Sequence, residues 1–111
     1  MQTISAQELK QKLDRNEDFV LLNVLDEDSF QKEHIPQSGN IPLDEENFVE
    51  KVEQNAGSKD AEIILYCASV ECPASEKAYE KLEEAGFSNL YEYEGGMKTW
   101  KEENLPVERS V

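Results

Sequence analysis

Two strand-length runs of apolar residues constrain this 111-residue chain most. The first run is Phe19–Val24 and the second is Ile63–Tyr66, and each is almost uninterrupted by polar positions. Runs of this kind are typical of parallel strands that helices cover on both faces. Both are far too short to span a membrane. A chain of this length forms one domain, so we expect a single α/β domain over residues 1–111.

The segments around these runs alternate between helix and strand patterns. Ser5 and Glu8 fit a capping box that begins an amphipathic helix reaching about Asp14. Other helices are expected over residues 26–33, 44–54, 73–85 and the segment after 95–96, and other strands near 39–42 and 90–93. Gly86 is expected to end the third of these helices in the left-handed conformation. Such alternation predicts a mainly parallel sheet with right-handed crossovers.

The charge of the chain limits its partners. With 25 acidic and 11 basic residues the formal net charge is −14, so nucleic acid and membrane surfaces are poor partners. The segment Met1–Ser5 has neither the basic flank nor the apolar core of an export signal, so we expect a cytoplasmic protein with two free thiols. One histidine and two cysteines form no recognisable ligand set, and we expect neither a metal nor a cofactor.

Cys67 is the strongest candidate for chemistry, because it follows the second apolar run directly. Open α/β sheets bind ligands at the carboxyl ends of their strands. The loop Ala68–Cys72 leads into a helix near Pro73, and we expect backbone N–H groups of both to converge on the sulfur. That arrangement favours a thiolate able to attack a sulfur donor or a disulfide. The position alone fits a small buried residue equally well.

A set of motifs carries a family resemblance across nearly the whole chain. In order they are Phe19–Val24, Phe30, His34-Ile35-Pro36, Gly39–Leu43, Ile64–Cys67, Ala85-Gly86-Phe87, Leu90-Tyr91, Glu94-Gly95-Gly96 and Trp100. Their order and spacing resemble the rhodanese family. The resemblance implies a five-stranded, mainly parallel sheet flanked by helices on both faces. In active members, the cysteine at the position of Cys67 accepts a sulfane sulfur, commonly from thiosulfate, and passes it on to a thiophilic acceptor.

The resemblance implies a sulfurtransferase in which Cys67 is the nucleophile and persulfide carrier. Loop amides would stabilise the anionic persulfide as an oxyanion hole does. The implied substrate-binding residues are Ala68, Ser69, Val70, Glu71, Cys72 and Ser75. Glu71 is expected to face solvent, since an inward carboxylate would repel thiosulfate. The implied partners are a small sulfur donor, such as thiosulfate or a persulfide, and a thiol acceptor on a small molecule or a protein.

Three departures from the family pattern keep other functions open. Asn23-Val24-Leu25 stands where many members have Asp-Val-Arg, and Cys72 stands where many place an arginine. The segment from Cys67 to Gly86 is also longer than usual. An enlarged loop resembles those of dual-specificity phosphatases and arsenate reductases, but these need an arginine to bind the oxyanion. The first basic residue after the cysteine is Lys77, inside the predicted helix, which disfavours a phosphatase.

Two alternatives to sulfur transfer remain. The missing arginine favours a non-catalytic rhodanese-like module that binds a partner or reports redox state. A Cys67/Cys72 pair with thiol–disulfide chemistry is the other. On packing grounds we expect Cys72 to fill a pocket under Pro73 without meeting Cys67. His34 is expected to be structural, and Gly95-Gly96 to allow close backbone approach beside the loop.

Overall fold

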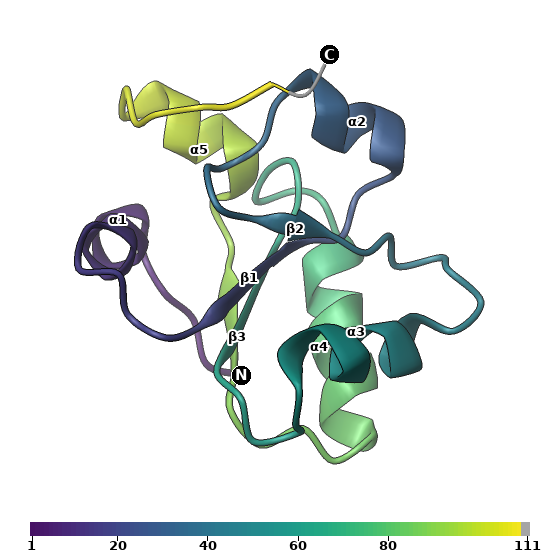
Figure 1. Cartoon of the computed structure of the whole chain (residues 1–111). Coiled ribbons are helices and arrows are strands. Elements are labelled where there is room, and N and C mark those ends of the chain that lie inside the picture. Colours follow the sequence, from purple (N-terminus) through teal and green to yellow (C-terminus); the bar gives the residue numbers. More distant parts are fainter. Residues whose placement is uncertain (110–111) are drawn as a thin grey trace.

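The computed structural model describes residues 1–109, so the last two residues of the predicted domain lie outside the described part. Helices and strands alternate along the chain, as the sequence predicts (Figure 1). In order, they are α1 (Ala6–Asp14), β1 (Val20–Asn23), α2 (Glu27–Lys32), β2 (Gly39–Asn40), α3 (Phe48–Ala56), β3 (Ile63–Tyr66), α4 (Ala74–Glu84), β4 (Leu90–Tyr93) and α5 (Gly96–Glu102).

The strands form one parallel sheet in the order β2-β1-β3-β4. The prediction of a parallel sheet is confirmed, whereas the expected fifth strand is wrong for the described residues. Thr3 makes a single parallel bridge to Glu92 of β4, next to that outer strand. The N-terminal segment therefore lies beside the β4 edge, but one bridge is too short to count as a strand.

Helices cover both faces of the sheet, as expected (Figure 1). Successive side chains of a strand point to opposite faces, and β3 shows why both must be covered. Ile63 and Leu65 pack in the apolar cluster with α3 and α4, while Ile64 and Tyr66 pack in the cluster with α1 and α5. All four β3 side chains are buried. Burial on both faces explains why the sequence shows an apolar run and no alternation.

The helix ends follow local signals with one exception. The capping box of Ser5 and Glu8 is present, and Gly86 adopts a left-handed φ of 99° just after α4. The exception is α3, which begins at Phe48 and not near residue 44. Tight-turn hydrogen bonds from Glu45 N to Pro42 O and from Phe48 N to Glu45 O occupy the segment where the helix was expected.

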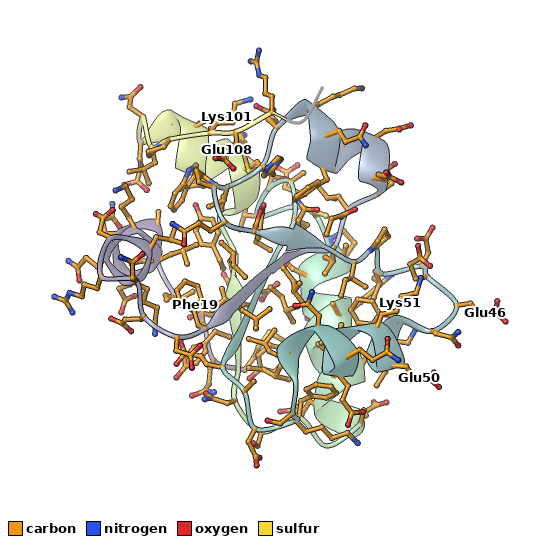
Figure 2. All side chains as sticks on the ribbon, viewed as in Figure 1. Phe19, Glu46, Glu50, Lys51, Lys101 and Glu108 are labelled. Atoms are coloured by element: carbon orange, nitrogen blue, oxygen red, sulfur yellow. The ribbon has the colours of Figure 1, made fainter. Side chains whose placement is uncertain are left out.

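The charged residues coat the outside of the molecule. Glu46 and Glu50 are exposed and project away from the ribbon (Figure 2). Lys51 forms an ion pair with Glu45 at 2.7 Å, but exposed pairs of this kind contribute little to stability. Among the helices of the described residues, none combines the length and the apolar character needed to cross a bilayer.

Candidate active site

Cys67 lies at the carboxyl end of β3, the position expected from the sequence. Because the side chains of β3 alternate, its sulfur points to the same face as Leu65, toward α4. The residue is 1% exposed and belongs to the apolar cluster on that face. Its Sγ atom hydrogen-bonds to the hydroxyl of Ser75 at 3.4 Å and to the carbonyl oxygen of Cys72 at 3.4 Å.

The orientation of the loop differs from the expected amide cradle. The carbonyl oxygens of Ser69 and Cys72 face the Cys67 sulfur, at 4.0 and 3.4 Å. The prediction that loop amides surround this sulfur is therefore wrong for Cys72, whose N–H group donates to Ser69 O instead. The backbone N–H group that does lower the pKa of Cys67 by hydrogen bonding belongs to Ser75, in the first turn of α4.

Cys72 lies beside Cys67, contrary to the expectation that the two thiols do not meet. The Cys72 N–H group donates to Ser69 O at 3.1 Å, and this turn folds the loop back toward the end of β3. The Cys67 thiol donates a hydrogen bond to the carbonyl oxygen of Cys72 at 3.4 Å, so the two residues are in contact. Hydrogen bonding by the Cys67 thiol and by the N–H groups of Ala74 and Ala68 lowers the pKa of Cys72. The donors thus gather around Cys72, which is half-buried, more than around the fully buried Cys67.

The two thiols have opposite tendencies to ionise. Burial raises the pKa of Cys67 first, and its contact with Cys72 raises it further, against the lowering effect of Ser75. Burial also raises the pKa of Cys72, but the hydrogen bonds from Cys67, Ala74 and Ala68 outweigh it, so this pKa lies below its usual value. In the resting site the thiolate therefore forms more readily on Cys72, with Cys67 as a hydrogen-bond donor to it.

Glu92 is the site residue that the sequence analysis missed. Its side chain is 5% exposed, and one of its carboxylate oxygens accepts a hydrogen bond from Ser75 Oγ at 2.6 Å. A chain of hydrogen bonds thus runs from the Cys67 thiol through Ser75 to a buried acid. Burial is the main reason why the pKa of Glu92 is raised, and nearby Glu94 and Glu76 raise it further.

A sequence signal for Glu92 did exist. Within β4, Leu90 packs on the α4 face and Tyr93 on the opposite face. Alternation along the strand then places Glu92 on the same face as Leu90. The register pairs Glu92 with Leu65, two residues before Cys67. An acid at an inward position of a predicted strand is a candidate for function, since buried charges are costly.

Gly96 fixes the position of the loop, which confirms the close approach expected of the Gly95-Gly96 pair. Gly96 has a φ of 63°, and a Cβ atom there would lie 2.5 Å from the carbonyl oxygen of Cys67. The backbone N–H groups of Met97 and Lys98 donate to the carbonyl oxygens of Cys67 and Ala68, at 3.0 and 2.9 Å. The first turn of α5 thereby holds the start of the loop.

The remaining predicted residues lie around the loop at different depths. Ala68, Val70 and Glu71 are exposed, Ser69 is half-buried and Ser75 is buried. Glu71 thus faces solvent as expected. A pocket of about 360 Å³ borders the loop and is lined by Ala68, Met97 and charged residues, which are Glu33, Lys98, Lys101 and Glu102. Figure 2 labels one of these lining residues, Lys101 of α5.

Two other sequence features have structural contacts. His34 stacks on Phe30 with ring centroids 4.0 Å apart, and its Nδ1 atom lies 2.8 Å from the Phe30 carbonyl oxygen, as expected of a structural residue. Asn23 is the last residue of β1 and is fully buried. Its side-chain oxygen accepts a hydrogen bond from Leu25 N at 2.8 Å. A neutral amide here needs no buried cation at residue 25.

The fold and site together define a class of protein: a parallel α/β domain with a thiol at the end of a central strand and a loop that enters a helix. Comparison with known families makes the class specific. The family model of the rhodanese-like domain matches residues 5–103. The chain belongs to the rhodanese-like domain family.

Individual relatives agree with this assignment. The chain is 34% identical over 97 residues to the putative sulfur carrier protein YrkF of Bacillus subtilis, a match that covers 87% of this chain. It spans about half the length of YrkF, or 49%. It is also 29% identical over 91 residues to the thiosulfate sulfurtransferase GlpE of Coxiella burnetii, covering 81% of this chain and 78% of GlpE.

A solved structure supports the fold independently. The crystal structure of BH2092 from Bacillus halodurans superposes with a TM-score of 0.87 at 28% sequence identity. The superposition covers 98% of this chain and 77% of that one. The arrangement of helices and strands in Figure 1 is therefore also present in an experimentally determined structure.

Proposed function

We propose that this protein is a sulfurtransferase that carries a sulfane sulfur as a persulfide on Cys67. The observation that carries the proposal is the position of Cys67, at the end of the central strand β3 and hydrogen-bonded to Ser75 in the first turn of α4. Membership of the rhodanese-like family supports it, as does similarity to a thiosulfate sulfurtransferase.

The proposed reaction has two displacement steps at sulfur. In the first, the Cys67 thiolate attacks the outer sulfur of thiosulfate, the S–S bond of the donor breaks, and its electron pair leaves with sulfite. In the second, an acceptor thiolate attacks the terminal sulfur of the persulfide, and Cys67 leaves as a thiolate. A persulfide donor reacts in the same way, with a thiolate leaving instead of sulfite.

Cys72 is the group proposed to take up the proton of Cys67. The Cys67 thiol lies 3.4 Å from the carbonyl oxygen of Cys72, and hydrogen bonding by this thiol is one reason why the pKa of Cys72 is lowered. Movement of the proton to a thiolate on Cys72 would create the Cys67 nucleophile without adding a charge to the buried site. The N–H group of Ser75 would then stabilise the new thiolate, since it lowers the pKa of Cys67, whereas the Ser75 hydroxyl donates its proton to Glu92.

We propose that substrates approach over the exposed side of the loop. Ala68, Val70 and Glu71 are the exposed members of the predicted substrate-binding set, with Ser69 and Cys72 half-buried behind them. The pocket beside Ala68 contains two lysines and two glutamates, and so it carries no net charge in a chain whose net charge is −14. A small anion would meet less repulsion there than over most of the surface.

The test is the intact mass of the reduced protein after exposure to thiosulfate or polysulfide. We expect the wild type to gain one sulfur atom, removable by cyanide, and Cys67→Ser to gain none. The proposal also includes thiosulfate as the donor, a thiol as the acceptor and a location in the cytoplasm. A folded wild-type protein that gains no sulfur from either donor would overturn it.

A second candidate function is a non-catalytic binding or redox-reporting module. The raised pKa and the 1% exposure of Cys67 favour it, because both slow attack by this thiol. The same mass experiment separates the two candidates. A non-catalytic module should have the same intact mass before and after exposure to thiosulfate or polysulfide. Its binding to a partner should be unchanged in Cys67→Ser.

A further inference from the structure

Two cysteines share this site, and sulfur transfer by the proposed mechanism uses only one of them as the carrier. Cys67 is fully buried at the end of β3, whereas Cys72 is half-buried at the entrance to α4. The turn from Ser69 to Cys72 brings the second cysteine against the first, because Cys67 Sγ lies 3.4 Å from the carbonyl oxygen of Cys72. The question is what a second thiol does when it lies next to the first.

The surroundings of Cys72 make it the better attacking group of the pair. Hydrogen bonds from the N–H groups of Ala68 and Ala74 lower the pKa of its thiol, as does the Cys67 thiol in the resting site. The two N–H groups remain donors after Cys67 has become a persulfide without a proton on its inner sulfur, and the thiolate that they stabilise is the form of cysteine that attacks sulfur. Cys67, by contrast, faces the carbonyl oxygens of Ser69 and Cys72, which disfavour negative charge on it.

The order of the atoms decides what this thiolate can attack. The Sγ atom of Cys67 is the atom that faces Cys72, and in a Cys67 persulfide it is the inner of the two sulfurs. The terminal sulfur then lies one bond further from the protein. Attack on the inner sulfur makes hydrosulfide the leaving group, which is a good one at neutral pH.

We propose that this protein is also a persulfide reductase, in which Cys72 attacks the inner sulfur of the Cys67 persulfide and releases hydrosulfide. The new bond joins Cys67 Sγ to Cys72 Sγ, and the bond between Cys67 Sγ and the terminal sulfur breaks. The terminal sulfur leaves with the electron pair of that bond and is reduced to hydrosulfide, while the two cysteines are oxidised to a disulfide.

The catalytic cycle closes with an external dithiol reductant. One of its thiolates attacks the Cys67–Cys72 disulfide to give a mixed disulfide, and its second thiol releases the reduced protein. The dithiol thereby supplies the two electrons that convert the sulfane sulfur to hydrosulfide. This inference rests on the proposed persulfide of Cys67, and it adds the fate of the sulfur when no acceptor thiol intervenes.

The experiment follows intact mass and released hydrosulfide over time in three proteins after a short exposure to polysulfide and removal of the donor. These are the wild type, Cys72→Ser and Cys67→Ser, each checked for folding by far-UV circular dichroism. We expect the wild type to gain one sulfur atom briefly. It should then lose that sulfur as hydrosulfide and become lighter than the reduced protein by two hydrogen atoms. Peptide mapping should find the disulfide between residues 67 and 72.

The variants separate the two proposals. Cys72→Ser should keep its added sulfur at least about tenfold longer than the wild type, without releasing hydrosulfide. Cys67→Ser should gain no sulfur and form no disulfide. If the wild type and Cys72→Ser hold the added sulfur equally long, the reductase is overturned and the sulfur carrier stands. Transfer of the intact sulfur to residue 72 also overturns the reductase. If neither protein gains sulfur, both proposals fail together.

Discussion

The hydroxyl of Ser75 donates a hydrogen bond to a carboxylate oxygen of Glu92 over 2.6 Å, and both side chains are buried where the first turn of α4 meets β4. The same hydroxyl is 3.4 Å from the Cys67 sulfur. Ser75 therefore links the candidate nucleophile to the most deeply buried acid of the described residues. The acid has consequences for both stability and chemistry, and each can be measured.

Replacement of Glu92 by Gln should change how stability depends on pH. The folded pKa of Glu92 is raised above its ordinary value of 4.5, chiefly by burial. An acid with a raised folded pKa contributes its full stability below its unfolded pKa and loses that contribution as the pH rises through the folded pKa. The free energy of unfolding of the wild type should therefore fall across this window, whereas that of Glu92→Gln should fall less.

Urea unfolding at a series of pH values from ~4 to ~8 measures this difference. Glu50→Gln is a matched control, because Glu50 is an exposed acid that projects into solvent (Figure 2). The control should parallel the wild type at every pH. Parallel curves for Glu92→Gln and the wild type would show that the buried acid titrates as it does in the unfolded chain.

Replacement of Ser75 by Ala should destabilise the protein through Glu92. The change leaves a buried carboxylate without the Ser75 hydroxyl, and an unsatisfied buried polar group costs about 1–3 kcal/mol. The loss should be largest at neutral pH and smaller in acid, where Glu92 is protonated. In the Glu92→Gln background the same substitution should cost less, and the double-mutant cycle gives the coupling energy. Equal costs in both backgrounds would mean that Ser75 acts independently of Glu92.

The fold was largely predictable because its signals are periodic. The runs Phe19–Val24 and Ile63–Tyr66 are apolar since both faces of β1 and β3 are covered, and the sequence shows this directly. The number of strands was not predictable in the same way. Five strands were expected from the family resemblance, but in the described residues the N-terminal segment makes only a single bridge, from Thr3 to Glu92, and this pairing depends on contacts across nearly the full length of the chain.

The site was predictable only in part. The position of Cys67 follows from the end of an apolar run, but the direction of the loop does not follow from residue types. Each peptide unit between Ser69 and Cys72 carries both a donor and an acceptor, and the turn between these residues decides which of them faces the sulfur. That turn also brings Cys72 to Cys67, which packing arguments from the sequence did not predict.

The two cysteines should differ in their reaction with iodoacetamide. The pKa of Cys72 lies below its ordinary value of 9.0 and that of Cys67 lies above it. Because the thiolate is the reacting form, the half-buried Cys72 should be modified first, with a rate that rises at lower pH than for free cysteine. Peptide mapping after partial modification at several pH values identifies the modified residue.

Cys67→Ser provides an internal check on the cause of this reactivity. The Cys67 thiol is one of the donors that lower the pKa of Cys72. A serine hydroxyl reaches less far toward Cys72, because a C–O bond is shorter than a C–S bond. The pH at which Cys72 reacts should therefore move upward in this variant. Modification of Cys67 before Cys72 in the wild type would contradict the assignment of the thiolate to Cys72.

Replacement of Gly96 by Ala should displace the loop after Cys67, because Gly96 packs against the backbone of that loop at the start of α5. The new Cβ atom would lie 2.5 Å from the carbonyl oxygen of Cys67 and 2.7 Å from backbone atoms of Ala68 and Ser69. A left-handed φ of 63° adds strain of its own. Together the clash and the strain should lower the free energy of unfolding by at least about 2 kcal/mol. Because the clash is with backbone, only a shift of the loop or of α5 relieves it.

Gly57→Ala separates strain from collision. Gly57 also has a left-handed φ, of 88°, but a Cβ atom there would meet nothing within 4 Å. This variant should lose only about 1 kcal/mol and keep full sulfur loading. Gly96→Ala, measured below its unfolding transition, should load sulfur on Cys67 more slowly than Gly57→Ala. If the two variants load sulfur at the same rate, the reactivity of the loop does not depend on its contact with Gly96. The first turn of α5 would then contribute to stability and not to sulfur loading.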